Sequence, residues 1–348
     1  MLTPQQSNYW GPLHAGLLGR RQVAIGGADR VGGVKKRALL AGALAAPTAA
    51  GIWGAVIEPH LFAIRRHTLP ILPAGAESIR ILHVADLHLA PWQKHRASWV
   101  KALTRLEPDV VVNTGDNLSA DIVPDVLDVF SGLLDTPGVF VLGSNDFFSP
   151  QAKNPAKYLR SPSQVKHRVN PDLDVGALVR GFEEPTSPSS SEDGGQGWHF
   201  LDNTEATLTI KGTRIHFSGL GDAHIDRDRI RWSGGEPGEG EIEHPRFDPE
   251  ADLKVGVTHA PYSRTLEAFA SARADLIMAG HTHGGQIRVP FWGAPVTNCD
   301  LDRTRARGVF PYRKSLVAIS AGLGFSPYSP VRFACRPEVS VLELVAKA

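Results

Sequence analysis

Five short polar blocks stand in order along the chain, and each follows a run of apolar residues. The blocks are rich in Asp, Asn and His, which supply the oxygen and imidazole ligands that hold divalent metals. The apolar runs before them are short and mostly β-branched, which is typical of buried strands. The blocks are Asp86-Leu87-His88, Gly115-Asp116-Asn117, Gly143-Ser144-Asn145-Asp146, Thr258-His259-Ala260 and Gly280-His281-Thr282-His283-Gly284-Gly285.

The apolar runs predict five strands whose carboxyl ends carry the blocks. Helices are expected between the first three strands, at Ser98–Leu106 and Ile122–Leu134. A β-α-β-α-β order implies parallel pairing, and open α/β sheets place their sites at the carboxyl ends of such strands. We therefore predict that the blocks meet at one edge as a two-metal site. The strands are expected at Ile79–Val84, Val110–Val112, Val139–Leu142, Leu253–Val257 and Leu276–Ala279.

The order and residue types of the blocks resemble those of the calcineurin-like metallophosphoesterase superfamily, in particular its bacterial members with an N-terminal membrane or export segment. The resemblance covers about residues 79–345. It implies two divalent ions bridged by Asp116, and donors of this kind favour Mn, Fe or Zn. The implied ligands are Asp86, His88 and His283 for one ion, and Asn145, His259 and His281 for the other.

The resemblance also implies a reaction, the hydrolysis of a phosphate ester or a diphosphate bond by a metal-bound hydroxide. Two cations about 3.5–4 Å apart lower the pKa of a bridging water and hold the attacking and leaving oxygens. Asp116 would supply the negative charge that lets two dications approach, so it is predicted to be catalytic as well as a ligand. The alternative is a catalytically weak or inactive scaffold that serves as a binding module.

The third block departs from the family pattern Gly-Asn-His-Asp/Glu, in which Asn binds metal and His acts on the leaving group. Aligned without a gap, Ser144 replaces the ligand Asn and Asn145 replaces the His. Shifted by one residue, Asn145 remains the ligand and Asp146 takes the catalytic His position. The shift is favoured, because an amide oxygen binds metal better than a neutral hydroxyl does.

Nearby cations would keep Asp146 ionised and make it a poor acid. The enzyme is therefore expected to prefer leaving groups that are already acidic, such as those of aryl phosphates or diphosphates. Loop residues are the usual source of leaving-group recognition, although turn or packing roles explain each candidate as well. The candidates are Asn117, Phe147, Phe148, His224 and Arg288.

The fold class that the resemblance implies is α/β, a two-sheet β-sandwich flanked by helices, in residues 79–348. Short alternating runs after Trp198 suggest that the second sheet is more antiparallel than the first. Two stretches rich in Ser, Pro, Glu and Gly, at Glu183–Gly197 and Ser233–Glu243, are expected to be loops. Cys299 and Cys335 could pair or could be two buried thiols.

The overall charge says which partners to expect. The chain has 348 residues and a net charge of +1, which argues against a broad nucleic-acid-binding surface. Basic residues do cluster at Arg303-Thr304-Arg305-Ala306-Arg307, as a solvated loop or as a phosphate-binding patch. The expected partner is a phosphorylated small molecule or a lipid substrate.

The N-terminus is a separate hydrophobic segment. A basic tail at residues 1–37 precedes 20 uncharged residues, Ala38–Ile57, and a linker is expected at residues 58–78. Twenty residues can just span a bilayer, so the segment is read as a membrane anchor, with a cleaved export signal or a soluble helix as alternatives. The excess of basic residues before Ala38 predicts a single-pass protein of the cell membrane with an extracytoplasmic catalytic domain.

Overall fold

The chain divides into two units, Met1–Ala50 and Gly51–Ala348. The computed structural model describes residues 47–151, 170–184, 197–235, 240–289, 291–325 and 328–347. In the first unit this leaves residues 47–50, which are helical and exposed. The second unit contains all five polar blocks.

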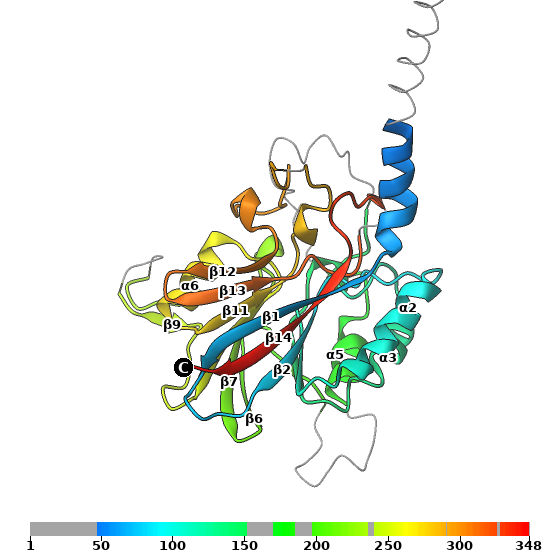
Figure 1. Ribbon diagram of the computed structural model, residues 1–348. Helices are drawn as coiled ribbons and strands as arrows, with labels where there is room; N and C mark the ends of the chain where they lie inside the picture. The colour runs from blue at the N-terminus through cyan, green and yellow to red at the C-terminus, as the bar shows by residue number, and fades with distance from the viewer. Residues whose placement is uncertain are drawn as a thin grey trace, which may run out of the picture. The chain divides into compact units, whose positions relative to one another are not determined.

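The first sheet has six strands in the order β1-β14-β2-β3-β4-β5 (Figure 1). Strands β2 to β5 run parallel to one another. β14, near the end of the chain, pairs antiparallel with β2 and parallel with β1. The strands are β1 (Ala63–Leu72), β2 (Ile79–Val84), β3 (Val110–Asn113), β4 (Gly138–Phe140), β5 (His199–Phe200) and β14 (Glu338–Ala346).

The second sheet also has six strands, in the order β12-β13-β11-β10-β7-β6. Its four inner strands are parallel, and only its edge strands pair antiparallel, so the expected antiparallel character is confined to the edges. A separate pair joins β8 (Arg231–Trp232) to β9 (Ile242–His244). The six strands are β6 (Glu205–Ile210), β7 (Thr213–Leu220), β10 (Leu253–Thr258), β11 (Leu276–Ala279), β12 (Gly308–Tyr312) and β13 (Ser315–Ile319).

The two sheets share an apolar core, and the alternation of side chains in β3 shows how. Val110 and Val112 belong to a cluster that includes Phe217 and Val255 of the second sheet. Val111, between them, belongs to a second cluster with the helices. Successive side chains of a strand point to opposite faces, so a strand covered on both faces reads as a continuous apolar run. The valine run of β3 is therefore explained by its position between the second sheet on one face and the helices on the other.

Helices cover the outer face of each sheet. Val100, Phe130 and Phe182, from three different helices, pack in the cluster beneath the first sheet, and Leu266 and Phe269 pack against the second. The covering helices are α2 (Lys94–Lys101), η3 (Ala102–Leu106), α3 (Val123–Phe130), α5 (Val175–Glu183) and α6 (Ser263–Ser271). This arrangement confirms the predicted α/β sandwich flanked by helices.

The start of the folded unit differs from the prediction. The linker expected at residues 58–78 is wrong for its middle part, because Ala63–Leu72 is a ten-residue strand that pairs with β14 along nearly its whole length. Before it lie a π-helical turn, η1 (Trp53–Ile57), and a 3-10 turn, η2 (Glu58–His60). Residues 1–46 lie outside the described part of the chain. In the described part, no helix has the length and apolarity needed to span a membrane.

The sequence left open whether the two cysteines form a disulfide or are two buried thiols. Cys299 and Cys335 are both buried, and both are free thiols. The alternative of two buried thiols is therefore confirmed, and the disulfide is excluded.

Candidate metal centre

The five blocks meet where the parallel strands of both sheets end. Asp86, Asp116 and Asn145 follow β2, β3 and β4, which are parallel neighbours in the first sheet. His259 and His281 follow β10 and β11, which are parallel neighbours in the second. Because the sheets face each other, the carboxyl ends of these strands bring the blocks together across the sandwich.

Local backbone geometry aims the side chains inward. Asp86, His88, Asp116, His281 and His283 all have positive φ, between 43° and 67°. This left-handed region is uncommon for residues other than glycine, and such residues cluster at functional sites. The first two blocks are also tied together, since the amides of Asp86 and His88 donate to the carbonyls of Gly115 and Asp116, each over 2.9 Å.

Glycine is required beside the carboxylate of Asp116. A Cβ at Gly143 would lie 2.3 Å from Asp116 Oδ1 and 2.6 Å from the ring of His259. No side chain fits in that space, so Gly143 allows the third block to approach the centre closely.

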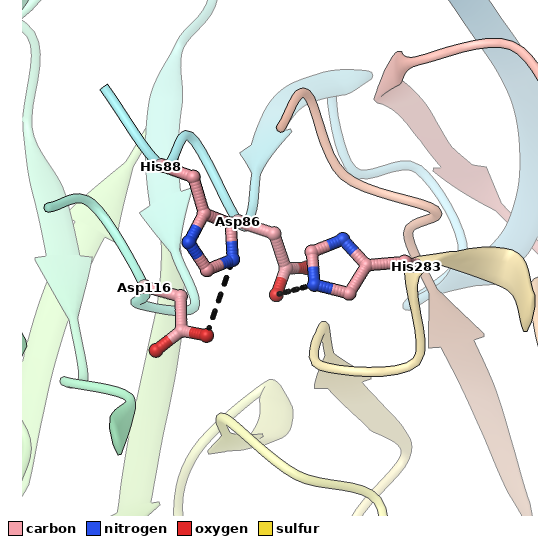
Figure 2. A group of neighbouring side chains, drawn as sticks. All are labelled: Asp86, His88, Asp116 and His283. Carbon is pink, nitrogen blue, oxygen red and sulfur yellow. Dashed lines mark ion pairs between the residues drawn. The ribbon is translucent and has the colours of Figure 1, made fainter. Parts of the chain in front are cut away.

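A first group of ligand atoms comes from Asp86, His88, Asp116 and His283 (Figure 2). One ligand atom from each of the four lies within 4.8 Å of the others. His88 Nε2 is 3.3 Å from Asp116 Oδ2, and His283 Nε2 is 3.8 Å from Asp86 Oδ1. Both ring nitrogens of His88 are buried without a hydrogen bond. A buried imidazole without a hydrogen bond, facing two carboxylates, has the donor set of a divalent metal site.

A second group also includes Asp116. His259 Nε2 is 3.5 Å from Asp116 Oδ2 and 3.2 Å from His281 Nδ1. Asn145 completes the group, because its side-chain amide is 2.8 Å from the same Asp116 oxygen. Asp116 Oδ2 thus lies near both His88 and His259, which is the position expected of a bridging carboxylate.

Backbone carbonyls orient the two histidines of the second group. His259 Nδ1 lies 2.7 Å from the Thr114 carbonyl oxygen, and His281 Nε2 lies 3.1 Å from that of Asn298. A ring N–H donated to a carbonyl fixes the tautomer and leaves the other nitrogen to accept, as metal-ligating histidines commonly do. The orientation of both rings therefore fits a metal.

The charges of the centre favour cations. Burial raises the pKa of Asp86 to about 6. Burial would also raise the pKa of Asp116, but His259 and His88 hold it well below its usual value. The pKa of His259 is raised to about 9, because the charges of Asp116, Asp222 and Asp86 outweigh its burial. In the protein without metal, a proton on His259 thus balances carboxylates that bound dications would otherwise neutralise.

Asp146 has an interior position that does not suit its predicted role. Its Oδ2 accepts the backbone N–H groups of Asp116 and Gly143 at 2.8 and 3.0 Å. Its Oδ1 accepts those of Asn117 and Leu118 at 2.7 and 3.2 Å. Burial raises the pKa of Asp146 to about 6, so the group is mostly ionised at neutral pH. A fully buried carboxylate that accepts four backbone N–H groups is not placed to protonate a leaving group, and it instead fixes the turn carrying Asp116.

Three of the five leaving-group candidates are interior residues. The side chain of Asn117 bonds to Asn113 and Asp146, and Phe147 and Phe148 belong to the core. The other two candidates lie at the centre's border. The ring of His224 is 4.5 Å from that of His281, and Arg288 donates to the carbonyl of Gly284.

The prediction missed Asp222, a buried carboxylate near the centre. It follows β7 in a Gly221-Asp222 pair, the same kind of signal that identified Asp116. Its Oδ1 accepts the backbone N–H of His224, whereas its Oδ2 is buried without a hydrogen bond. Burial raises the pKa of Asp222 to about 7.

Comparison with known proteins agrees with the fold and the centre, which together define a metal-dependent phosphoesterase. A sequence model of the calcineurin-like phosphoesterase family matches residues 79–285, more than half of the chain. The chain therefore belongs to this family.

Three relatives align with most of their length. The metallophosphoesterase YkuE of Bacillus subtilis is 24% identical, over 88% of this chain and 93% of the relative. The phosphodiesterase YaeI of Escherichia coli is 26% identical, over 83% and 90%. The UDP-2,3-diacylglucosamine pyrophosphatase LpxG of Chlamydia trachomatis is 26% identical, over 86% and 94%.

Proposed function

We propose that this phosphoesterase uses two divalent ions, Mn, Fe or Zn, to hydrolyse a phosphodiester or diphosphate bond. One observation supports the proposal most strongly: Asp116 Oδ2 lies close to a histidine of each ligand group, 3.3 Å from His88 Nε2 and 3.5 Å from His259 Nε2. When bound, two such ions acidify a water and stabilise the charge that develops on a phosphoryl group. The proposed ligands are Asp86, His88 and His283 for one ion, Asn145, His259 and His281 for the other, and Asp116 for both.

The protein's own residues supply orientation and negative charge. Thr114 and Asn298 fix the rings of His259 and His281 through their carbonyls. Asp146 holds the turn of Asp116. Burial of Asp86 and Asp116 keeps their charges unscreened, so that they attract cations more strongly than exposed carboxylates would.

Substitution of Asp116 tests the shared ligand. In Asp116→Asn the bridging charge is lost for both ions, so activity should fall by more than in any single His→Asn variant, about 100-fold or more. Hydrolysis of an aryl phosphodiester and bound metal are measured together. Asp128→Asn, an exposed carboxylate on α3, is the matched control and should retain both. Unchanged hydrolysis in Asp116→Asn would refute the proposal.

The third block has its own test. If Asn145 is a ligand, Asn145→Ala loses one ion per chain and Ser144→Ala keeps both. The opposite result would support the alignment without a gap.

The proposed substrate class follows from the position of Asp146, which does not act as a general acid. Both oxygens of Asp146 are held by backbone N–H groups, so Asp146 does not supply a proton to the leaving oxygen. Aryl phosphates and diphosphates have acidic leaving groups, and relatives named as a phosphodiesterase and a pyrophosphatase support this class. General acid catalysis is worth about 10²–10⁴-fold. Alkyl esters should therefore react more slowly than aryl esters by a comparable factor, and equal chemistry-limited rates would contradict the idea.

We further propose that the N-terminal segment anchors the protein in the cell membrane, with the catalytic domain on the extracytoplasmic side. The support is the 20-residue uncharged segment after a basic tail. A reporter enzyme fused after Ala348 should be active outside the cytoplasm. Activity only in the cytoplasm would overturn this orientation, and release of the soluble domain would indicate a cleaved signal.

A further inference from the structure

Large apolar side chains are exposed on several segments of the second unit, among them three that are joined by backbone hydrogen bonds. Phe291 is fully exposed at the tip of a tight hairpin, in which Val289 and Gly293 exchange two backbone hydrogen bonds. Contiguous exposed apolar surface is unusual in a soluble protein and marks an interaction site. We name these residues the apolar rim: Trp53, Val56, Val289, Phe291, Trp292 and Tyr328.

Backbone contacts hold the three segments side by side. The amide of Arg332 donates to the carbonyl of Gly54 over 2.8 Å, which joins the segment after Tyr328 to the turn that carries Trp53. The amide of Arg288 donates to the carbonyl of Phe333 over 2.8 Å, which joins the hairpin to the same segment. In Figure 1 the red segment before β14 lies beside the blue helix. The three segments that carry the rim are therefore neighbours in the fold.

The rim adjoins the metal centre. The hairpin follows His283 within a few residues, and Arg288 bonds back to the carbonyl of Gly284 over 3.0 Å. Whatever the rim contacts is thus brought close to the proposed ligands.

The composition of the rim points to a lipid surface. Tryptophan and arginine favour the boundary between lipid and water, and Arg303 stacks on Trp292 with its guanidinium carbon 4.6 Å from the ring centroid. Arg288 adds a second cation suited to anionic head groups. In addition, the uncharged segment Ala38–Ile57 ends on this surface, where Trp53 and Val56 are exposed while Glu58 is buried.

We propose that the part of the apolar rim outside the N-terminal segment, Val289, Phe291, Trp292 and Tyr328, inserts into the bilayer as a second membrane contact. This contact lies next to Trp53 and Val56 of the N-terminal segment and sets the metal centre at the head-group layer. This proposal rests on the proposed membrane location. It also suits a substrate whose phosphate lies at a membrane surface, such as a lipid-linked diphosphate.

Site-specific labelling of the full chain tests the insertion. Both native thiols are buried, so a maleimide fluorophore should react selectively with a cysteine introduced by Phe291→Cys or Tyr328→Cys. Thr209→Cys is the control, because Thr209 is exposed on β6 beside the turn at the opposite end of the sandwich. Each labelled chain is reconstituted in vesicles of phosphatidylethanolamine and phosphatidylglycerol, and its emission is titrated with a spin-labelled lipid and, separately, with iodide.

The proposal expects probes at 291 and 328 to be quenched strongly by the lipid and weakly by iodide, with the reverse at 209. Quenching by iodide alone at 291 and 328 would overturn it. So would protection from both quenchers, which would mean that a second copy of the chain or another protein covers the rim. Neither readout requires catalysis, and co-flotation of the chain with vesicles reports the N-terminal contact separately. Failure of the rim is therefore distinguishable from failure of the proposed function or anchor.

Discussion

At the scale of single residues, substitution of Asp146 tests whether this residue has a structural role. In either amide orientation, Asp146→Asn turns its NH₂ group toward two backbone N–H groups that the carboxylate accepts. Unsatisfied buried donors cost about 1–3 kcal/mol each. We expect the free energy of unfolding in urea to fall by about 2–4 kcal/mol. Asp128→Asn should leave it nearly unchanged, and an equally mild effect of Asp146→Asn would contradict the turn-holding role.

The raised pKa of Asp222 predicts that the stability of the folded protein depends on pH. Its pKa is raised by burial from 3.8 to about 7 in the folded protein, so ionisation costs free energy there but not in the unfolded chain. The contribution of Asp222 to the free energy of unfolding is therefore most favourable at low pH and is lost as pH rises from 3.8 through about 7. Each pKa unit is worth about 1.4 kcal/mol.

Asp222→Asn keeps the acceptor for the His224 amide but cannot ionise. In chelator-treated protein, its stability should fall less than that of the wild type between about pH 5 and about pH 8. Parallel pH profiles for the two proteins would show that Asp222 is not the group responsible.

The residues of the centre differ in how well the sequence predicts them. Asp86, Asp116 and His259 were predictable, because each follows an apolar strand and strand ends converge. The role of Asp146 was not, since sequence order does not reveal which backbone N–H groups point at a side chain. Asp222 carried the same signal as Asp116 and could have been found.

At the scale of elements, the segment after β13 holds the first ligand in place. The buried guanidinium of Arg332 donates to the carbonyls of Ala321 and Gly322 over 2.8 and 3.1 Å. The same segment donates from Gly324 to the carbonyl of Asp86 over 2.6 Å. Arg332 therefore positions Asp86 without touching it.

Arg332→Met should lower stability by about 2–4 kcal/mol, because several buried carbonyls lose their donor. Metal analysis should show loss of the ion held by Asp86, His88 and His283 before the other. Arg313→Met, at an exposed arginine, is the control. Full retention of both ions at normal affinity would contradict the positioning role.

Strand β1 was missed because its pattern is that of an edge. Arg65, Arg66 and His67 interrupt the apolar residues, and the partner strand β14 lies about 270 residues further along the chain, so no local signal indicates the pairing. Leu72 is nevertheless fully buried in the core between the sheets.

Leu72→Ala should therefore cost about 2–4 kcal/mol of unfolding free energy, as for other buried leucines. Ile64→Ala, at an exposed position of the same strand, should cost less than about 1 kcal/mol. Equal, small effects would indicate that this stretch acts as a linker after all.

At the scale of the whole molecule, two facing sheets explain why a few short motifs determine the site, because the strands that carry the ligands are parallel within each sheet. The fold was predictable because every block follows a strand and the strands alternate with helices. The arrangement of the rim was not, because it depends on contacts between segments that lie far apart in sequence and carry no shared pattern.

The central claim is that Asp116 lies between two metal ions. Anomalous scattering from crystals of the full chain grown with Mn²⁺ tests it most directly. We expect two peaks about 3.5–4 Å apart, one on each side of the Asp116 carboxylate. One peak should lie among Asp86, His88 and His283, and the other should lie between His259 and His281. A single peak, or two peaks that Asp116 does not join, would contradict it.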